Sequence, residues 1–570
     1  MSIEYLPFPA AGQTLRKTAL SRFSGDLPVA IFGGLVMFAV GLVVLPRISI
    51  PLLDEAFYVI PAIRLAETGH LLLEPSIQPS LVSQVVWGAL FSKVLGGGFI
   101  AVRVAVLVAS ALGAVCFYLL LRQLGCARRA AAVALGVLIF NPMYISGSVT
   151  FMTEVPFTAL VLGTLVVGMA GLRRNHLGLV LAAGCLAALA FLTRQIGVLL
   201  VPALAVGLLS ARRRRRSARF WLAWVLPSLL AVTAFVLWRY GPGAPSGTGF
   251  TYSRAIAQWG QDSGFALEMA RRVARAIAYL GVFSLPLLVI HAPGLWRHLR
   301  GLDRYGKRAL GAGLLIAAAT YLLAWTGGVP PLPYLSSPDH PVGGLIALPL
   351  PGGRALPREA LTAVLTFGLW AAGGLTLGLA LGTTRLPVRR WFTHPHFCLY
   401  LAGGLLLVAA LSSYVVYDRY FLPLMPLAMI VCLAGTRAVR PSLPLAALVL
   451  ALSATVSTAF MLDKTQRLSA AWGAAADLVE AGVRANDIDA GLEWAVWWSL
   501  WPSYPVGEGV QGSLGRVRPW ANRPYQVTPS LLPGYVVERT YYVWTPLHLR
   551  AQPLYVLHIG AAPRPPETHQ

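Results

Sequence analysis

The sequence is poor in charged residues, and acids are the scarcer kind. Only 12% of the 570 residues are charged, with 22 acidic residues against 46 Lys and Arg. Soluble globular domains carry about twice this charge fraction, so a water-soluble globular protein is excluded. The net charge of +24 would suggest nucleic acid as a partner of a soluble protein. Here Lys and Arg collect in short loops between apolar runs, and no nucleic-acid partner is expected.

Clustered cysteines and nucleotide motifs are also missing. The five cysteines are dispersed and form neither a CxxC pair nor a Cys/His cluster, which argues against a disulfide framework and a thiolate metal site: Cys116, Cys126, Cys185, Cys398 and Cys432. No Walker motif is present, so no nucleotide or organic cofactor is expected. No small-residue cleavage site follows the first apolar run, and Leu27–Pro46 is expected to be a retained helix.

Apolar residues dominate the chain, at 56% of the sequence with a mean hydropathy of +0.66. Runs of roughly 20 apolar residues, enough to cross a membrane as a helix, recur along most of it. The predicted fold class is an all-α polytopic membrane protein, because helices satisfy their own backbone hydrogen bonds in lipid. About thirteen spans are predicted, with twelve as the alternative: 27–46, 99–121, 130–145, 155–171, 177–192, 196–209, 220–238, 276–295, 309–325, 361–381, 397–416, 420–433 and 443–461.

The distribution of charge predicts the orientation of these spans. Loops on one side are short and basic, with Asp303 as their only acid, whereas the other acids and most aromatic, Gly and Pro loop residues fall on the opposite side. The positive-inside rule then places segment 1–26 in the cytoplasm. The arginine run at 212–216 is interpreted as a cytoplasmic anchor rather than a lipid-headgroup patch. The protein is expected in the inner or plasma membrane.

Two segments outside the spans are also predicted to be structured. In the first extracytoplasmic loop, residues 47–98, the stretches Ala56–Glu67 and Leu81–Val94 have helical apolar spacing and are expected to lie in the membrane interface. The transmembrane region, 27–462, is followed by a small extracytoplasmic α+β domain, 463–570.

Within the C-terminal domain, a helix is expected at Ala470–Ala485, and strands at Tyr535–Trp544 and Leu554–Ile559. The tryptophans from Trp494 to Trp501 could stack on sugars, but an interfacial belt with a small-domain core is preferred.

One stretch of the predicted outer face holds two adjacent acids, Asp54 and Glu55, in PLLDEAFY. Acids near hydrocarbon need water, partners or a function. Glu154, Arg194 and the run Asp418-Arg419-Tyr420 emerge at the same face. Taken singly, Glu154 could favour a helix start, Arg194 could snorkel, and Asp418-Arg419 could be a local ion pair. Their shared side of the membrane favours one common cavity.

The sequence also resembles the GT-C glycosyltransferases. The stretch Asp54–Gly69, with DEAFY and IRLAETG, is similar to their first extracytoplasmic loop, and more narrowly to the protein mannosyltransferase and aminoarabinose lipid A transferase branch. The resemblance is good over the first two hundred residues, patchy to about 440 and absent from the C-terminal domain. It continues in further segments: Phe99–Arg103, Leu119–Gly125, Asn141–Phe157, Leu189–Pro202 and Asp418–Leu427.

This resemblance implies transfer of a sugar, with inversion, from a polyprenyl-phosphate donor to a lipid, glycan or protein acceptor at the outer face. Membrane lipids would be further partners. Asp54 matches the catalytic aspartate of the family and would be the general base, with Glu55 as a second catalytic carboxylate. Arg194 and Arg419 would hold the phosphate in bidentate fashion. The remaining expected substrate-binding residues are Tyr58, Glu154, Gln195, Arg254, Asp418 and Tyr420.

A divalent cation is a further expectation, held by Glu55 and Glu154 through oxygen ligands. The chain has Thr153 beside Glu154 where the family has an acidic doublet, which weakens the case for a metal.

Two other function classes fit parts of the pattern. A transporter or flippase for a lipid-linked sugar or anionic solute would also use acids and arginines in a cavity. Transporters, however, place such charges near the bilayer midplane and often have an internal repeat, and no repeat is seen here. A non-catalytic assembly subunit that keeps the fold is the third hypothesis. The retention of Asp54 together with the arginines argues against it.

The predicted orientation can be tested by cysteine-accessibility labelling. We expect a cysteine placed at Ser246 to react with a membrane-impermeant reagent from outside, and one placed at Ser217 to react only from the cytoplasm. The reverse pattern would overturn the common cavity of Asp54, Glu154, Arg194 and Arg419.

Overall fold

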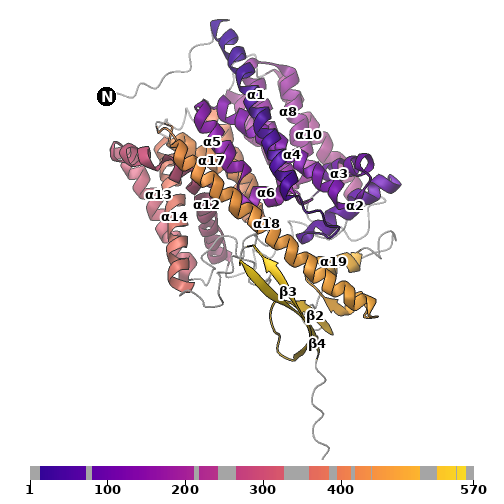
Figure 1. Ribbon diagram of the computed structural model, residues 1–570. Coiled ribbons are helices and arrows are strands. Elements are labelled where there is room, and N and C mark those ends of the chain that lie inside the picture. The colour runs from indigo at the N-terminus through magenta and orange to yellow at the C-terminus, as the bar shows by residue number, and fades with distance from the viewer. Residues whose placement is uncertain are drawn as a thin grey trace, which may run out of the picture.

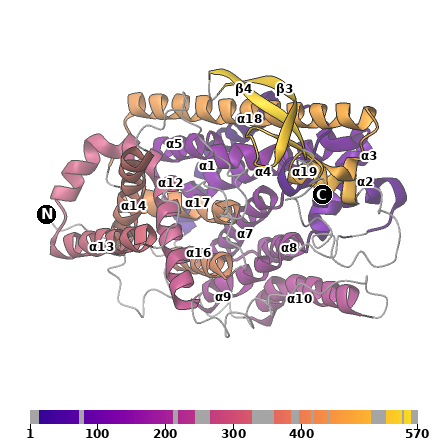
Figure 2. The ribbon, with the colours of Figure 1, turned by 90° about the horizontal axis from the view of Figure 1, so that it is seen from below.

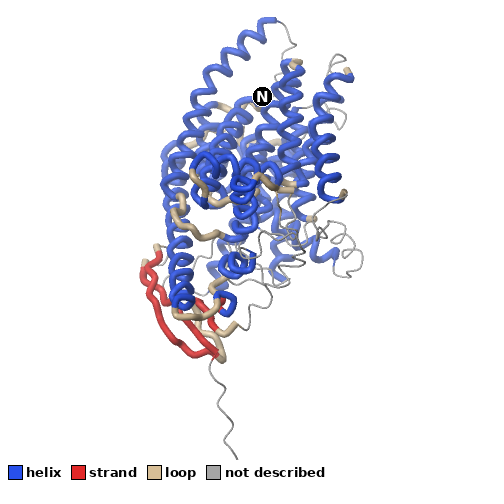
Figure 3. The backbone as a smooth tube through the Cα atoms, turned by 90° about the vertical axis from the view of Figure 1, so that its right-hand side faces the viewer, coloured by secondary structure: helices blue, strands red, loops and turns tan. Residues whose placement is uncertain are grey.

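The computed structural model describes residues 13–71, 73, 80–210, 217–241, 265–326, 358–383, 395–412, 418–437, 439–500, 523–546 and 549–559. Most of these residues are helical, and the helices pack side by side into a bundle (Figure 1). A small sheet lies at one end of the bundle, and α1 begins at the other end (Figures 1 and 3).

The helices vary widely in length. The α-helices are α1 Gln13–Val44, α2 Ala56–Thr68, α3 Val82–Leu95, α4 Gly98–Gln123, α5 Arg128–Ile139, α6 Pro142–Ser148, α7 Glu154–Arg174, α8 Leu177–Thr193, α9 Leu200–Ser210, α10 Ala218–Tyr240, α12 Phe265–Arg300, α13 Arg304–Thr326, α14 Arg358–Thr383, α16 Pro395–Leu411, α17 Met425–Gly435, α18 Leu443–Glu480 and α19 Leu492–Leu500. Short 3₁₀ segments are η1 Leu53–Glu55, η2 Gln195–Leu199, η4 Asp418–Leu424 and η5 Ala485–Asp487.

Seven helices in the described part of the chain are long and apolar enough to cross a membrane: Gly25–Val44, Gly98–Gln123, Glu154–Arg174, Ala218–Tyr240, Phe265–Arg300, Arg304–Ala324 and Leu443–Glu480. A bent pair, α5 with α6, would make eight. The protein is therefore an integral membrane protein. The prediction of thirteen spans is not confirmed, because several of the expected spans are apolar helices of only 10–17 residues.

The predicted span at 130–145 shows why the helices are shorter than expected. It is divided between α5 and α6, which meet at 62°. Asn141 caps the second helix, its side chain accepting from the backbone N–H groups of Met143 at 3.0 Å and Tyr144 at 3.3 Å, and Pro142 begins it. Both residues favour a helix start over a helix interior. The bend turns the chain towards the segment that precedes Glu154.

Basic residues from loops far apart in sequence gather at the end of the bundle where α1 begins. Arg122 pairs with Asp26 at 2.9 Å, and Arg128 with the same carboxylate at 3.6 Å. Arg173 donates to the carbonyl of Gln123 at 2.7 Å. The structure thus brings together side chains that the sequence assigns to one side of the membrane.

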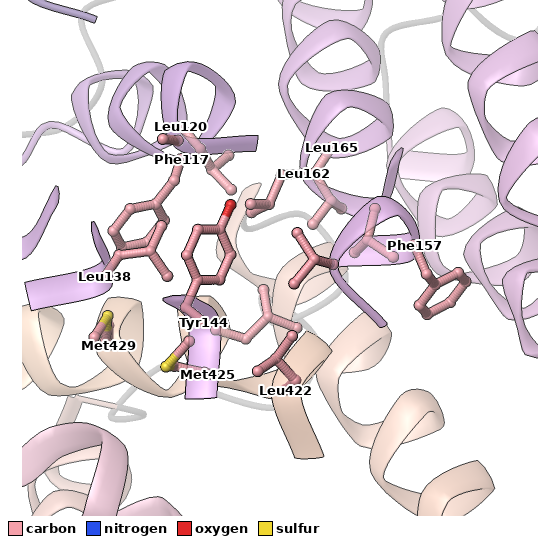
Figure 4. Packing of buried hydrophobic residues seen from close by; sticks show 14 of the residues in the cluster. Phe117, Leu120, Leu138, Tyr144, Phe157, Leu162, Leu165, Leu422, Met425 and Met429 are labelled. Carbon is pink, nitrogen blue, oxygen red and sulfur yellow. The ribbon is translucent and has the colours of Figure 1, made fainter. Parts of the chain in front are cut away.

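The interior of the bundle is apolar and closely packed. Figure 4 shows Tyr144 of α6 among Phe117 of α4, Leu138 of α5 and Met425 of α17, all of them buried. The Tyr144 hydroxyl donates to the carbonyl of Ser110 at 2.8 Å, so its one polar atom is satisfied. This packing fixes α6 against α4.

The C-terminal sheet has four strands in the order β1-β2-β4-β3: β1 Ile488–Asp489, β2 Tyr525–Thr528, β4 Arg550–Ile559 and β3 Tyr535–Thr545. β1 pairs with β2 in parallel, and the other pairs are antiparallel. The predicted strands at Tyr535–Trp544 and Leu554–Ile559 are confirmed. The predicted helix Ala470–Ala485 is instead the last part of α18, which runs unbroken from the bundle to the sheet.

Helix α19 connects this domain to the segment between α1 and α4. It packs against η1 and α2, and the rings of Trp497 and Phe99 lie in contact, tilted by 43° at a centroid distance of 5.4 Å. Trp494, which is buried, packs instead in the core of the sheet domain, 5.0 Å from Trp472. Trp497 therefore packs against the helical bundle, whereas Trp494 packs in the core of the sheet domain. Trp501 lies outside the described residues. Through α19, the C-terminal domain covers the turn that carries Asp54.

Candidate active site

The turn η1 places Asp54 and Glu55 in opposite environments. Glu55 is fully buried, whereas the Asp54 side chain is 25% exposed. The Leu52 N–H donates to Glu55 Oε2 at 2.9 Å, which closes the turn. Helix α2 begins directly after it and ends at Gly69, whose φ of 74° suits glycine. Two adjacent acids thus point to different surroundings.

Glu55 forms a bidentate ion pair with Arg103 of α4. Arg103 Nε donates to Oε1 at 3.0 Å and Nη2 to Oε2 at 2.6 Å. The Phe151 N–H donates to Oε1 at 2.7 Å, and the Leu52 bond completes the set. A carboxylate has about four acceptor positions, and all are occupied. Glu55 is therefore not available as a proton acceptor or as a metal ligand.

The hydrogen-bond donors of the Arg103 guanidinium are also fully used. Its remaining N–H groups donate to the carbonyls of Pro46 at 3.0 Å, Ile48 at 2.8 Å and Ile50 at 2.7 Å. All five donors of the side chain are thus engaged, and one buried residue fixes the path of the chain from the end of α1 to η1. This anchor holds the backbone that carries Asp54.

The second cluster lies beside the first and involves four separate segments. Arg419 Nη2 donates to Asp54 Oδ2 at 2.5 Å, and Arg419 Nε lies 3.5 Å from Glu154 Oε1. Arg194 Nη1 donates to the same Glu154 oxygen at 2.8 Å and to Thr153 Oγ1 at 3.0 Å. Four residues that the sequence assigns to one face, Asp54, Glu154, Arg194 and Arg419, therefore meet in one network.

Two tyrosines flank this network. The Tyr420 ring lies 5.0 Å from Arg194 Cζ and 5.9 Å from Arg419 Cζ, within range of cation–π attraction to both. Tyr58 of α2 is buried. Burial, and then the negative charge of Asp54, raise the pKa of Tyr58 above its ordinary value, while Arg419 opposes the shift. Tyr58 therefore stays a neutral hydroxyl that can donate a hydrogen bond.

Glu154 differs from Glu55 in having one open oxygen. Its Oε2 is buried and has no hydrogen-bond partner among the described residues. Buried polar atoms are normally paired, so this oxygen is available to a substrate hydroxyl.

The expected metal site at Glu55 and Glu154 does not fit these contacts, because the acceptor positions of Glu55 are all taken. Within the described ranges, no three His, Cys, Asp or Glu side chains form a metal-binding group.

Among the expected substrate-binding residues, Gln195 begins η2 and is half-buried next to Arg194, and no contact in the described part of the chain joins its side chain to the network. The backbone of Asp418 begins η4 next to Arg419. The side chain of Asp418 and the whole of Arg254 lie outside what the structure describes.

Sequence reasoning missed Arg103 and Thr153 as parts of the site. Arg103 could have been identified from the sequence, because a charged residue within a predicted membrane span indicates a functional or structural role. A single hydroxyl such as Thr153 gives no comparable signal.

Comparison with protein families defines the class. Residues 85–238 match the family model described as dolichyl-phosphate-mannose-protein mannosyltransferase. The chain is a membrane glycosyltransferase, as this match indicates. The matched segment covers about a quarter of the chain and agrees with the resemblance to the protein mannosyltransferase branch found in the sequence. A comparison with curated proteins finds no match.

Two solved structures are similar to the chain at low identity. ArnT from Cupriavidus metallidurans bound to undecaprenyl phosphate shares 15% identity, with 92% of this chain and 97% of that chain covered and a TM-score of 0.35. An oligosaccharyltransferase from Archaeoglobus fulgidus, tethered with an acceptor peptide, shares 14% identity over 78% of this chain and 56% of that chain, with a TM-score of 0.40. TM-scores of this size do not establish a shared fold, so the assignment depends on the family match.

The Arg103 anchor makes a prediction about stability. We expect Arg103→Ala to lower the free energy of unfolding by about 3–5 kcal/mol, because Glu55 would keep a buried charge without its partner. Arg103→Lys should recover little of this lost stability, since an ammonium cannot reach the same set of acceptors. Denaturant titration of the purified protein in detergent measures both.

Arg128→Ala is the matched control. That side chain is 57% exposed and lies 3.6 Å from Asp26, so its loss should change stability by about 1 kcal/mol or less. Equal effects of the Arg103 and Arg128 substitutions would contradict the anchor.

Proposed function

We propose that the protein is an inverting glycosyltransferase that moves a sugar from a polyprenyl-phosphate donor to a lipid, glycan or protein acceptor. The reaction takes place at the outer face of the membrane, with Asp54 as the general base. The N-terminus lies in the cytoplasm and the C-terminal domain outside. The observation that carries this proposal is the pairing of the partly exposed Asp54 carboxylate with Arg419 inside one network of acids and arginines.

The roles of the site residues in this proposal follow from their charges. The donor phosphate needs cations as its bond to the sugar breaks, since negative charge accumulates on the leaving oxygen. Arg194 and Arg419 have the planar fork that matches phosphate oxygens. In the structure described here, both bind carboxylates instead. An arriving phosphate competes for these guanidinium groups.

Engagement of Arg419 by phosphate frees Asp54 for chemistry. The acceptor hydroxyl oxygen then attacks the anomeric carbon while Asp54 removes its proton. The bond between the anomeric carbon and the phosphate oxygen breaks, and its electron pair stays with the polyprenyl phosphate. Attack on the face opposite the leaving group inverts the configuration, and a single base on the attacking face is sufficient.

Other residues of the site orient the reactants. The open Glu154 Oε2 accepts a hydrogen bond from a substrate hydroxyl. Tyr58 donates one as a neutral phenol. Glu55 takes no part in proton transfer and acts as a positioning residue, through Arg103 and the backbone that precedes Asp54.

The nature of the partners is supported by the family match and by what the neighbours bind. The family model is named for a lipid-phosphate sugar donor and a protein acceptor, and the ArnT structure holds undecaprenyl phosphate. An apolar helical bundle also suits a substrate with an isoprenoid tail, which can stay in the bilayer while its phosphate reaches the network.

The role of Asp54 is tested by Asp54→Asn. We expect transfer to fall by a factor of about 10² or more, because the amide cannot take the proton, while the protein still inserts and folds. Product formation from a panel of polyprenyl-phosphate sugars, read by mass spectrometry, measures it. Asp303→Asn, in a loop at the opposite side, is the control and should leave the rate unchanged. Near-normal turnover of the Asp54→Asn variant would refute the assignment of Asp54 as the general base.

The role of Arg194 is tested separately. We expect Arg194→Ala to raise the KM for the donor about tenfold, the loss of one charge-assisted contact, with a much smaller effect on the KM for the acceptor. Steady-state kinetics with each substrate varied in turn measures the difference. The exposed Arg297, changed to Ala, should alter neither constant. An effect confined to the acceptor would refute the phosphate role of Arg194.

A further inference from the structure

Helix α3 is in contact with segments that carry both charged clusters of the site. It lies beside α2 at one side of the bundle (Figures 1 and 2) and packs against α2, α4 and α8. Its Gly88 leaves no room for a side chain, because an added Cβ would meet the Phe151 ring and the Ala62 Cβ. Phe151 in turn donates its N–H to Glu55 at 2.7 Å. One side of α3 is therefore packed against the anchor that holds Asp54.

The beginning of α3 is hydrogen-bonded to the end of α8, directly before Arg194. The Leu81 N–H donates to the carbonyl of Thr193 at 3.2 Å, and the Ser80 hydroxyl donates to the carbonyl of Phe191. The last carbonyls of a helix have no partner within that helix. The end of α8 is thus capped by a segment more than a hundred residues earlier in the chain.

Two side-chain hydroxyls close the same junction. Ser83 Oγ and Thr193 Oγ1 lie 2.6 Å apart, and each lies 2.9 Å from the carbonyl oxygen of Leu189. Thr193 is buried. These bonds between residues 80–83 and residues 189–193 are called the α3–α8 clasp below.

Leu81 adopts an unusual backbone conformation within the α3–α8 clasp. Its φ is 60°, in the left-handed region that residues with a bulky side chain rarely enter. Its side chain is fully buried, and its N–H makes the bond to Thr193. Such strain persists only where the surrounding contacts enforce it, and it is frequent at functional sites. The contacts of the clasp therefore hold this junction in one geometry.

The backbone of Arg194 is also held on its other side. Arg194 follows α8 in an extended conformation, with φ −142° and ψ 129°, and its carbonyl accepts from the Gly197 N–H at 2.8 Å. Gly197 packs so closely on α8 that an added Cβ would meet the backbone of Ala190 and Phe191. The point from which the Arg194 side chain starts is thus fixed by the clasp and by η2 together.

We propose that Ser83 and Thr193 are positioning residues of the sugar transfer, which hold Arg194 at the distance from Asp54 that the reaction needs. This inference rests on the proposed function and deepens it. Helix α3 is bonded to the residue before Arg194 and packed against the Glu55 anchor. The clasp therefore sets the separation between the group that takes the proton and a group that binds the leaving phosphate.

The two hydroxyls act through Arg194 and not on the substrate. Both are engaged with each other and with a backbone carbonyl. A cation stabilises developing charge only from a fixed position, so loss of its support weakens the contact without removing the charge. Loss of either hydroxyl is then a milder form of the loss of Arg194, and it has no effect once Arg194 is gone.

The first test measures how firmly Arg194 is held and does not depend on turnover. The full-length protein in detergent is treated with phenylglyoxal, which modifies guanidinium groups, and peptides are quantified over time by mass spectrometry. We expect Ser83→Ala to raise the rate of modification of Arg194, which is 13% exposed, about fivefold, the effect of one lost hydrogen bond. Thr193→Val, which removes the other hydroxyl, should give the same increase. Arg122, 22% exposed at the opposite end of the bundle, should keep its rate.

The controls separate the clasp from a general loosening of the fold. Ser92→Ala, the same change in the last turn of α3, should leave the modification of Arg194 unchanged. Ser83→Thr keeps the hydroxyl and should react as the unmodified protein does. An unchanged rate at Arg194 in both Ser83→Ala and Thr193→Val overturns the clasp. An equal rise at Arg122 also overturns it.

The second test asks whether the clasp serves the reaction. We expect Ser83→Ala to raise the KM for the donor about fivefold, with little change in kcat or in the KM for the acceptor. In a protein that already carries Arg194→Ala, the same change should have no further effect, because both act through one side chain. Effects that multiply would refute the positioning role. Absence of sugar transfer in the unmodified protein would count against the proposed function, whereas the modification rates would still decide the clasp.

Discussion

The buried pair of Glu55 and Arg103 is the interaction on which the site depends. It joins α4 to η1, and it ties the three carbonyls between Pro46 and Ile50 to the same guanidinium. A buried ion pair contributes little net stability unless its remaining donors and acceptors are satisfied, and here both partners are complete. The main role of the pair is therefore to fix the position of the surrounding backbone. The pair fixes the backbone that holds Asp54 next to Arg419.

The second network has a different character, because its bonds can be exchanged. Arg419 is shared between Asp54 and Glu154, and Glu154 is shared between Arg419 and Arg194. Each guanidinium can leave a carboxylate for a phosphate without leaving the site. The saturated pair of Glu55 and Arg103 lies next to a network whose bonds can be exchanged. In this arrangement Asp54, the proposed base, keeps its position while its partner changes.

The sequence predicted which charged residues lie together better than it predicted the helices that hold them. Asp54, Glu154, Arg194 and Arg419 could be grouped from their common side of the membrane, because charge placement in a membrane protein follows simple rules. Glu55 was wrongly grouped with Asp54, since adjacency cannot reveal that Arg103, 48 residues later, occupies both of its oxygens. Hydropathy likewise could not foresee the bend at Asn141 and Pro142, where local capping overrides a continuous apolar run. The hairpin of β3 and β4 was predictable from its alternating pattern.

The continuity of α18 has a consequence for how the two parts of the molecule are related. The helix has 38 residues, and an unbroken helix of this size is about 57 Å long and turns by about 100° with each residue. The orientation of the sheet about the helix axis is therefore fixed relative to the side chains of α18 that pack in the bundle. Loss or gain of a single residue between Met461 and Ala474 would swing the sheet around the helix axis. The number of residues in this stretch therefore sets how the sheet domain is oriented relative to the proposed active site.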